Sequence, residues 1–400
     1  MELTKDQKNA FKEGKRWWKN KDKQVFVIQG KPGTGKTTII DKLIKEFGLK
    51  KKNVLFVTFV GRATLPLRQN GLNAKTIHSA CYYRKEDYIL DQFGQPILLK
   101  NNRYKKESKF VLKEELDSNI ELIVVDEGGM VDDIKCNDLE SFGIPILVTG
   151  DINQLPPVFG KSKWMRHPDV YLNEIVRQKA GDPIIHLADM AINGMEIPYG
   201  KYGKRCFVVD EEILQYPDIY TKPDIVICAK NKTRQNINDI VRYEVLGRKT
   251  EDPVVGDKLV CRRNNWNICL DDDIALINGL FGNVEHIYQE SYRGDTVNID
   301  FKPECSTNWI EDISIDLDYL KADINNKPDT KYSKGNIFEY GYSSTCHMAQ
   351  GSQYGYCMVI DESIGDEKFH RKYLYTAITR AKHTLVIVRK KRKKNFFMNF

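Results

Sequence analysis

The stretch Gln29-Gly30-Lys31-Pro32-Gly33-Thr34-Gly35-Lys36-Thr37-Thr38 decides the fold of this 400-residue chain. It fits the pattern G-x-x-x-x-G-K-[ST], in which glycines let backbone N–H groups converge on phosphate oxygens and the next helix offers its positive N-terminus. The pattern has this meaning only between a strand and a helix. A short apolar run precedes it at residues 24–28, and apolar residues at helical spacing follow it at residues 38–47. The stretch therefore predicts a strand–loop–helix unit that binds ATP or GTP.

Individual residues of this loop have expected roles. We expect Lys36 to reach the β- and γ-phosphates and the Thr37 hydroxyl to hold Mg²⁺. The other expected nucleotide contacts in the loop are Gly30, Gly33, Thr34, Gly35 and Thr38. Gln7 lies in a helical stretch capped by Thr4, and its amide can both donate to and accept from the exocyclic edge of adenine. Taken alone, Gln7 also fits a surface position.

Composition sets the class of protein. The chain is 41% hydrophobic and 10% aromatic, which suits compact cores and excludes a disordered protein, and its length predicts roughly two to four compact units. A net charge of +7 is compatible with a polyanionic partner. Nine scattered cysteines without a C-x-x-C pair favour reduced thiols over structural zinc. Since we find no signal peptide and no apolar run approaching about 18 residues, we expect a cytoplasmic protein without a membrane segment.

Strands and helices alternate along most of the chain. Apolar runs at residues 54–60, 123–127, 145–151 and 224–229 are typical of buried strands, and stretches with helical spacing separate them. Such alternation favours parallel sheets covered by helices on both faces, with ligand chemistry at the carboxyl ends of the strands. We predict an α/β fold with two parallel-sheet cores.

Two regions break the alternation. Between residues 82 and 108, the stretch 88–99 fits two short strands about a turn, with Phe93 near the tip, and predicts a small hairpin that projects from the first sheet. Short strands at residues 258–261, 274–276, 283–287 and 296–299, separated by turns, predict a small β-barrel insertion at residues 257–335 in the second core. The predicted division is a first core at 1–81 and 109–175 with insertion 82–108, and a second core at 176–256 and 336–400 with insertion 257–335.

Two polar sites follow buried strands downstream of the glycine loop. Asp126-Glu127 ends an apolar run, where Asp126 is suited to hold Mg²⁺ through water and Glu127 to polarise an attacking water. A lone Asp-Glu pair also occurs on surfaces, but the strand end favours the functional interpretation. In the stretch 150–158, Gln154 is suited to touch the γ-phosphate or its water and to report hydrolysis to the neighbouring surface.

Together with further stretches, these motifs resemble superfamily 1 helicases, specifically the RecD-like and Dda-like branch (superfamily 1B) that moves 5′→3′ on DNA. The resemblance covers nearly the whole chain in the family's order. The matching motifs lie at Gln7 and at residues 30–37, 58–63, 76–78, 126–130, 150–158, 174–178, 342–352 and 375–381. The resemblance implies two RecA-like P-loop NTPase cores, a hairpin insertion (1B) in the first and an SH3-like insertion (2B) in the second.

The resemblance also implies roles for residues of the second core. Arg177 and Arg380 correspond to arginine fingers, whose planar guanidinium stabilises a transferring phosphoryl group, and Gly351 corresponds to a nucleotide contact. Closure of both cores on ATP would bring the arginines to the γ-phosphate, and hydrolysis would release them. Without the family, an arginine after an apolar run would be interpreted as a solvated surface residue.

Single-stranded DNA is the implied partner. Hydroxyl, guanidinium and imidazole groups can donate to its phosphates, and aromatic rings such as Tyr82 and Tyr83 can stack on its bases. The predicted DNA contacts are Thr58, Arg62, Thr76, His78, Phe93, Thr345 and His347. Phe93 is the candidate wedge that separates the strands, although each ring or histidine taken alone also fits a core or loop position.

Four residues in three stretches depart from the family pattern. Gly128-Gly129 stands where relatives often have Ala-Ser or Ser-Ser, which predicts a looser turn. Met348 stands where relatives often carry Lys, which removes one phosphate contact, and Gln353 replaces Glu, which weakens an inferred ribose contact. The basic tail at residues 389–394 fits nucleic-acid binding, a nuclear address or a solvated end.

The sequence therefore predicts a monomeric ATP- and Mg²⁺-dependent DNA helicase. It would move 5′→3′ on single strands and act at single-strand/duplex junctions in replication, recombination or repair, with single-strand-binding or replisome proteins as further partners. Two alternatives stay open: a RecD-like subunit of a larger nuclease or replication assembly, and a translocase that strips proteins from DNA without unwinding. Polarity, and an origin in a phage or mobile element, rest on the resemblance alone.

Overall fold

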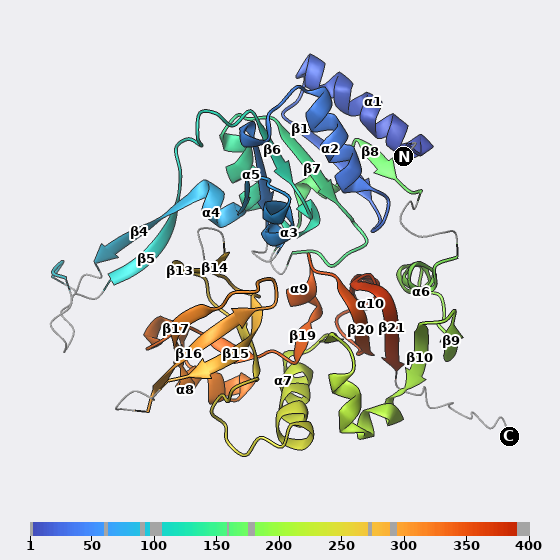
Figure 1. The fold of residues 1–400 in the computed structure, drawn as a ribbon. Helices are drawn as coiled ribbons and strands as arrows, with labels where there is room; N and C mark the ends of the chain where they lie inside the picture. The colour runs from blue at the N-terminus through green and yellow to red at the C-terminus, as the bar shows by residue number, and fades with distance from the viewer. Residues whose placement is uncertain are drawn as a thin grey trace. The chain divides into compact units, whose positions relative to one another are not determined.

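The computed structural model describes most of the chain (Figure 1). The described residues are 3–59, 63–88, 93–96, 106–157, 160–174, 181–270, 274–288 and 294–389. They form two compact units. The first unit takes its residues from 1–59, 66–151 and 156–174, and the second takes them from 60–65, 152–155 and 175–400. No helix among the described residues is long and apolar enough to cross a membrane.

The first unit is built on a six-stranded parallel sheet. In spatial order its strands are β3 (Ala74–Thr76), β2 (Val54–Thr58), β6 (Leu122–Val125), β7 (Ile146–Gly150), β1 (Val25–Gly30) and β8 (Val170–Leu172). The residues of β2, β6 and β7 are buried throughout, because helices cover both faces of a parallel sheet. This burial explains why these strands are mostly apolar throughout rather than alternating between apolar and polar residues.

Helices connect the strands of this sheet. They are α1 (Lys5–Asn20), α2 (Lys36–Glu46), α3 (Thr64–Gln69), α4 (Ile77–Cys81) and α5 (Asp133–Ser141), with 3₁₀ turns η1 (Lys51–Asn53), η3 (Gly128–Met130) and η4 (Lys163–Met165). Thr4 caps α1 in a capping box with Gln7, as the sequence predicts. Helices α1 and α2 approach closely at Gly14, where a Cβ atom would lie 2.7 Å from Leu43 Cδ2.

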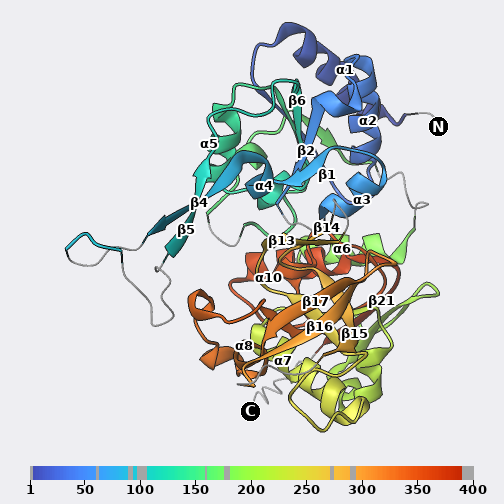
Figure 2. The same ribbon diagram turned by 60° about the vertical axis from the view of Figure 1, so that its left-hand side comes forward.

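A two-stranded hairpin projects from the first sheet (Figures 1 and 2). Strands β4 (Tyr82–Tyr88) and β5 (Lys106–Leu112) pair antiparallel from Tyr82 opposite Leu112 to Tyr88 opposite Lys106. The hairpin insertion is thus confirmed, but its described strands flank the segment in which the sequence pattern placed them. Within that segment, the stretch 88–99, residues 89–92 and 97–99 lie outside the described residues.

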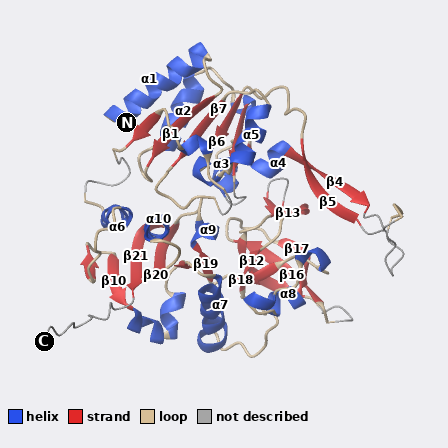
Figure 3. Cartoon of the chain, turned by 180° about the vertical axis from the view of Figure 1, so that it is seen from behind, coloured by secondary structure: helices blue, strands red, loops and turns tan. Residues whose placement is uncertain are grey.

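The second unit contains another six-stranded sheet (Figure 3). Its order is β19 (Ser343–Thr345), β11 (Ile225–Cys228), β20 (Tyr354–Asp361), β21 (Ala381–Arg389), β10 (Cys206–Asp210) and β9 (Gly200–Tyr202). All pairs are parallel except β9 with β10. Its helices are α6 (Pro183–Ile192), α7 (Asn231–Asp239), α9 (Cys346–Ala349) and α10 (Glu367–Ile378), with 3₁₀ turns η5 (Glu211–Gln215) and η6 (Pro217–Thr221) and the π-helix η7 (Ile240–Val245).

A β-rich insertion follows η7. Its antiparallel sheet has the order β17 (Ile310–Asp316), β16 (Thr296–Pro303), β15 (Phe281–Ile287), β12 (Lys258–Cys261) and β18 (Phe338–Tyr340), beside the pair β13 (Asn265–Leu270) and β14 (Ile274–Leu276). The short elements α8 (Leu317–Lys321), η9 (Ile324–Asn326) and η10 (Thr330–Tyr332) complete it. Its own apolar core includes Leu259, Phe301 and Phe338. The predicted fold class is confirmed, while the exact domain boundaries stay a prediction.

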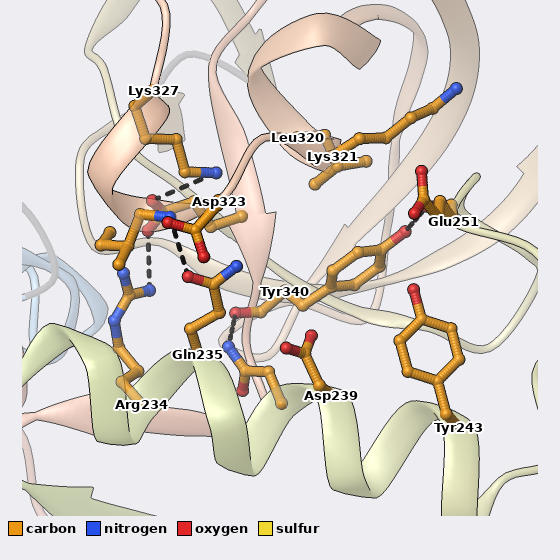
Figure 4. A pocket seen from close by; sticks show the side chains of 13 residues that line it. Arg234, Gln235, Asp239, Tyr243, Glu251, Leu320, Lys321, Asp323, Lys327 and Tyr340 are labelled. Carbon is orange, nitrogen blue, oxygen red and sulfur yellow. Dashed lines mark hydrogen bonds and ion pairs between the residues drawn. The ribbon is translucent and has the colours of Figure 1, made fainter.

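Buried ion pairs fasten the insertion to α7. Glu339 in β18 is buried and faces three cations: Arg234 Nη1 at 2.7 Å, Arg262 Nε at 3.0 Å and Lys327 Nζ at 3.8 Å. Burial raises the pKa of Glu339, but Arg262 and Arg234 outweigh burial, so that its pKa lies below the ordinary value. Glu339 lines a cavity of about 210 Å³ between α7 and the insertion, and Arg234 and Lys327 lie on one side of this cavity (Figure 4).

A second buried pair lies at the root of the insertion. Arg242 in η7 has no exposed surface and donates to Asp257 Oδ2 at 3.0 Å and to the Asp252 carbonyl at 2.7 Å. Its guanidinium lies 3.9 Å from the ring centroid of Tyr340. Asp257 also accepts a hydrogen bond from Tyr342 Oη at 2.8 Å. Because leaving any of these charges buried alone would be costly, the two clusters hold the insertion to the α7–η7 segment.

Candidate nucleotide site

The glycine loop lies between β1 and α2, as its sequence predicts. Gly33 and Gly35 both have φ of 81°, a left-handed conformation that glycine adopts without strain. At Gly35, which is the N-cap of α2, a Cβ atom would also lie 2.3 Å from Gln7 Nε2. Helix α2 has no side-chain cap and no acidic residue in its first turn, so its positive end is not neutralised by its own residues.

The polar side chains of the loop fold onto its backbone. Lys36 Nζ donates to the carbonyls of Gly30 at 2.7 Å and Lys31 at 3.3 Å. Thr34 is fully buried, and its hydroxyl donates to the Lys31 carbonyl at 2.8 Å. Thr37 and Thr38 are exposed in the first turn of α2. The inner side of the loop is therefore tied by its own hydrogen bonds, and Lys36 Nζ is held by carbonyls that a phosphate can replace.

Gln7 connects α1 to the loop. Its Oε1 accepts from the backbone N–H of Thr4 at 3.2 Å, and its Nε2 donates to the carbonyl of Thr34 at 3.0 Å. The side chain is buried, so the surface interpretation of Gln7 is wrong. Its amide is already shared between the helix cap and the loop, and the adenine contact stays a prediction.

Asp126 and Glu127 follow β6, at the edge of the sheet where the loop leaves β1. Asp126 Oδ1 accepts from Thr149 Oγ1 at 2.8 Å and from the backbone N–H of Glu127 at 3.0 Å. Thr149 lies on β7, the strand between β6 and β1 in the sheet. Glu127 has φ of 53°, an uncommon conformation for a residue with a side chain. The parallel sheet thus brings the two sequence motifs to one edge, as predicted.

The turn after Glu127 is tightly packed. A Cβ atom on Gly128 would lie 2.4 Å from Val148 Cγ1, and one on Gly150 would lie 2.7 Å from Met165 Sδ. Ser162 Oγ donates to the Gly128 carbonyl at 2.8 Å. The expectation of a looser turn at Gly128-Gly129 is therefore wrong, because Val148 and Met165 occupy the space that a larger residue would need.

The segment that carries Gln154 belongs to the second unit. The backbone N–H of Leu155 donates to Thr376 Oγ1 at 2.9 Å, and Gln350 Nε2 donates to the Leu155 carbonyl at 3.1 Å. Gln154 is buried, and within the described part of the chain its Oε1 has no hydrogen-bond partner. Sequence reasoning did not single out Gln350 and Thr376. Both lie within recognised motifs, but nothing in their spacing indicates the bonds to Leu155.

Arg380 is held in place by its own unit. It is buried, and its Nε, Nη1 and Nη2 donate to the Thr376 carbonyl at 3.1 Å, the Ser352 carbonyl at 3.2 Å and Thr379 Oγ1 at 3.1 Å. The interpretation of Arg380 as a solvated surface residue is therefore wrong. Gly351, next to Ser352, has φ of 74°. The other predicted arginine finger, Arg177, lies outside the described residues.

The predicted DNA contacts differ in exposure. Thr58, Thr76 and Thr345 are buried, and Thr76 caps α4 by accepting from the N–H of Ser79 at 3.1 Å. Phe93 is 78% exposed, which suits a side chain that meets a ligand. Arg62 lies outside the described residues.

The two histidines predicted to contact DNA are partly buried. Burial lowers the pKa of His78, with a further contribution from Lys135, and burial alone lowers the pKa of His347. The His78 ring packs on Tyr82 and Phe110, with centroids 5.4 and 5.6 Å apart. Because neutral imidazoles are favoured at pH 7, both would act as hydrogen-bond donors to a phosphate rather than as charges.

Solved structures share this architecture. The Pif1 helicase from Bacteroides in complex with ADP-AlF3 and single-stranded DNA aligns over 97% of this chain and 92% of its own, with a TM-score of 0.56 and 16% identity. The chain has a Pif1-like helicase fold. The Pif1 helicase from Candida albicans shares the helicase fold over 97% of this chain and 94% of its own, with a TM-score of 0.52 and 16% identity.

Sequence comparisons agree with the helicase fold. A family model described as an AAA domain matches residues 18–160, and one described as a UvrD-like helicase C-terminal domain matches residues 340–388. The ATP-dependent RecD2 DNA helicase of Deinococcus radiodurans is 24% identical over 383 residues, and an uncharacterised protein of Methanocaldococcus jannaschii is 23% identical over 482 residues. The predicted resemblance to RecD-like helicases is confirmed.

The chain spans less than half the length of these two curated relatives. The alignment with the Deinococcus protein covers 90% of this chain and 46% of that protein. The alignment with the Methanocaldococcus protein covers 93% of this chain and 37% of that protein. The relatives' whole-protein activities therefore enter only as part of the proposal below.

Proposed function

We propose that this protein is an ATP-dependent DNA helicase that translocates 5′→3′ on single-stranded DNA. The observation that carries the proposal is the glycine loop at the N-terminus of α2, beside Asp126 and Glu127 on the same edge of the sheet. The relatives support the class of reaction, since the RecD2 relative is named an ATP-dependent DNA helicase and a Pif1 relative is described with ADP-AlF3 and single-stranded DNA.

The loop residues fit a nucleoside triphosphate with Mg²⁺. Lys36 would exchange the carbonyls of Gly30 and Lys31 for phosphate oxygens, and Thr37 and Asp126 would hold the metal ion. The bound ion neutralises phosphate charge during transfer. Thr149 supports this role, because its hydrogen bond to Asp126 fixes the carboxylate that the ion requires. The left-handed backbone at Glu127 fixes the direction of the carboxylate proposed to orient the attacking water.

Residues of the second unit would couple hydrolysis to movement. Arg380 and the segment with Gln154 share a partner, because Thr376 accepts from Leu155 through its hydroxyl and from Arg380 through its carbonyl. A change at Gln154 can therefore reach the guanidinium of Arg380 through two hydrogen bonds. We assign Arg380 as an arginine finger and Gln154 as the sensor of the γ-phosphate on this basis and on the family resemblance. Arg177 is assigned as a second arginine finger on the resemblance alone.

The test is a steady-state ATPase assay with and without single-stranded DNA, followed by unwinding of forked substrates that carry a single 5′ or 3′ tail. We expect hydrolysis that single-stranded DNA stimulates, and unwinding from the 5′ tail. Absence of stimulated hydrolysis would remove the helicase proposal. Unwinding from the 3′ tail alone would leave a helicase of the opposite polarity.

A further inference from the structure

The outer face of α1 carries a stripe of positive charge. The helix contains six cations and two acids, and the cations are Lys5, Lys8, Lys12, Lys15, Arg16 and Lys19. All six are exposed. At about 100° per residue they fall within about 100° of arc, and they extend over about 20 Å of helix. We call this set the α1 stripe.

Packing of the opposite face fixes the direction of the stripe. Gln7, Ala10, Gly14 and Trp17 are the buried residues of α1, and they lie about 180° from the centre of the stripe. Gly14 allows α1 to contact α2 so closely that a Cβ atom would meet Leu43. Helix α1 lies on the outside of the first unit in all three ribbon views (Figures 1 to 3). The stripe is therefore a fixed surface of the first unit.

The acids of α1 do not neutralise the stripe. The Asp6 carboxylate is turned to the end of β8, where it accepts from the N–H groups of Asn173 at 2.7 Å and Glu174 at 3.2 Å. Glu13 lies 3.9 Å from Arg16, a surface pair that is worth little. Lys15 is paired with Glu46 of α2. The remaining cations give the outer face a net positive charge along its length.

We propose that the α1 stripe is a second DNA-binding site, which holds the phosphate backbone of duplex DNA. The inference rests on the proposed function for its class of ligand. A series of cations on one face neutralises phosphates without reading bases. The flanking ring of Trp18 is half-buried, stacked on Phe47 at 4.5 Å and approached by Lys21 Nζ at 5.3 Å from its centroid, so the chain's own groups already pack on this ring. A duplex, whose bases are already stacked inside, matches a surface of charge alone.

The charge pattern also favours DNA over an acidic protein partner. The centre of a protein interface is depleted of charged residues and is anchored by large apolar side chains. Along the stripe, consecutive positions within its arc are lysine or arginine, and the aromatic residues Phe11 and Trp18 are half-buried at its side. None of the predicted single-strand contacts lies on α1.

The test is duplex binding by a variant of the full chain without nucleotide. The variant carries Lys8→Gln, Lys12→Gln, Arg16→Gln and Lys19→Gln, which keeps the Lys15–Glu46 pair and uses a good helix former. The control carries four exposed changes in the second unit, Lys204→Gln, Lys222→Gln, Lys232→Gln and Lys249→Gln. Fluorescence anisotropy measures binding to a blunt duplex and to a single strand of equal length, from about 50 to 200 mM salt.

For duplex DNA, we expect the slope of the logarithm of the association constant against the logarithm of salt concentration to become less negative by about 3 to 4 in the α1 variant. Its affinity for duplex DNA near 100 mM salt should fall about 10-fold or more. The control and single-strand binding should change less than about twofold. A companion variant with arginine at Lys8, Lys12 and Lys19 should keep the wild-type slope, which separates loss of charge from loss of folding.

Two outcomes would overturn the inference. A duplex slope equal to that of the control would leave the stripe as a solvated face or a surface for an acidic protein. An equal loss for single-stranded DNA would mean that the stripe does not select duplex. The ATPase of the α1 variant should still be stimulated by single-stranded DNA, and failure of that stimulation in the wild-type protein would instead remove the proposed function.

Discussion

The first unit passes from β1 into α2 through glycines, and the second unit passes from β11 into α7 beside a carboxylate. In the first turn, Gly33 and Gly35 adopt left-handed conformations and no side chain caps the helix. In the second turn, the N–H groups of Ala229 and Lys230 donate to Glu362 Oε2 at 2.7 and 3.2 Å, and the Thr233 hydroxyl donates to the same carboxylate. Both turns join a buried parallel strand to a helix.

The difference shows what makes a strand-to-helix turn a phosphate site. Backbone N–H groups at such a turn attract an anion in either case. The second unit supplies that anion from its own chain, because Glu362 follows β20 and occupies the place an external phosphate would take. Among the described residues of the first unit, α2 has no side-chain cap and no acidic residue in its first turn, which leaves the turn to a ligand. We therefore expect one nucleotide to bind at the first turn and the second unit to contribute side chains only.

The largest expected effect is at Lys36. Replacement Lys36→Ala removes the ammonium that would pair with the β- and γ-phosphates, and we expect single-strand-stimulated ATP hydrolysis to fall about 100-fold or more. Lys42→Ala, an exposed lysine of the same helix, is the control and should leave hydrolysis unchanged. Steady-state ATPase assays measure the change. Hydrolysis by Lys36→Ala at the wild-type rate would contradict the assignment of the first turn as the nucleotide site.

The next effect is on stability in the second unit. Glu339→Gln would leave the cations Arg234, Arg262 and Lys327 around a neutral amide in a buried place, and we expect the free energy of unfolding to fall by about 3–5 kcal/mol. Urea denaturation measures the change. Glu285→Gln, which removes a surface pair with Lys302, should cost less than about 1 kcal/mol. Equal losses in both variants would argue that the Glu339 cluster does not hold the insertion.

A smaller effect is expected at Glu362, the carboxylate beside the second turn. Glu362→Gln weakens the charged acceptor of the Ala229 and Lys230 N–H groups, and we expect a loss of about 1–2 kcal/mol in stability. Nucleotide affinity, measured by titration calorimetry, should not change. A gain or loss of nucleotide binding in this variant would contradict the view that the second turn is satisfied by its own chain.

The smallest effect concerns pH. Because burial lowers the pKa values of His78 and His347 in the folded protein, the unfolded chain binds more protons as the pH falls through about 6.5. The free energy of unfolding should thus decrease from pH 7.5 to pH 5.5. The decrease should be smaller than the loss of about 3–5 kcal/mol expected for Glu339→Gln. The double variant His78→Gln and His347→Gln should lose part of this dependence in urea denaturation. The exposed His167→Gln should keep it, and an unchanged slope in the double variant would exclude these two histidines as the cause.

Sequence patterns predicted some elements closely and missed others for physical reasons. The strands at residues 258–261 and 274–276 have the predicted bounds. Strand β17 was missed because its buried residues, Ile310, Ile313 and Ile315, do not alternate. Asp312 between them has φ of 53°, and the pairing of β17 with β16 shifts register there, so a bulge interrupts the period of two.

By itself the sequence determined the nucleotide loop, the acidic pair after β6 and the two parallel sheets. These features depend on local spacing and on buried runs, which neighbouring residues along the chain specify. Tertiary structure decided which turn is open to phosphate, why glycine is required at Gly128, and where Leu155 makes its hydrogen bonds. Glu362, Val148 and Thr376 decide these points, and each lies far along the chain from the residue it meets. Spacing along a sequence carries no information on such contacts, because folding alone brings their partners together.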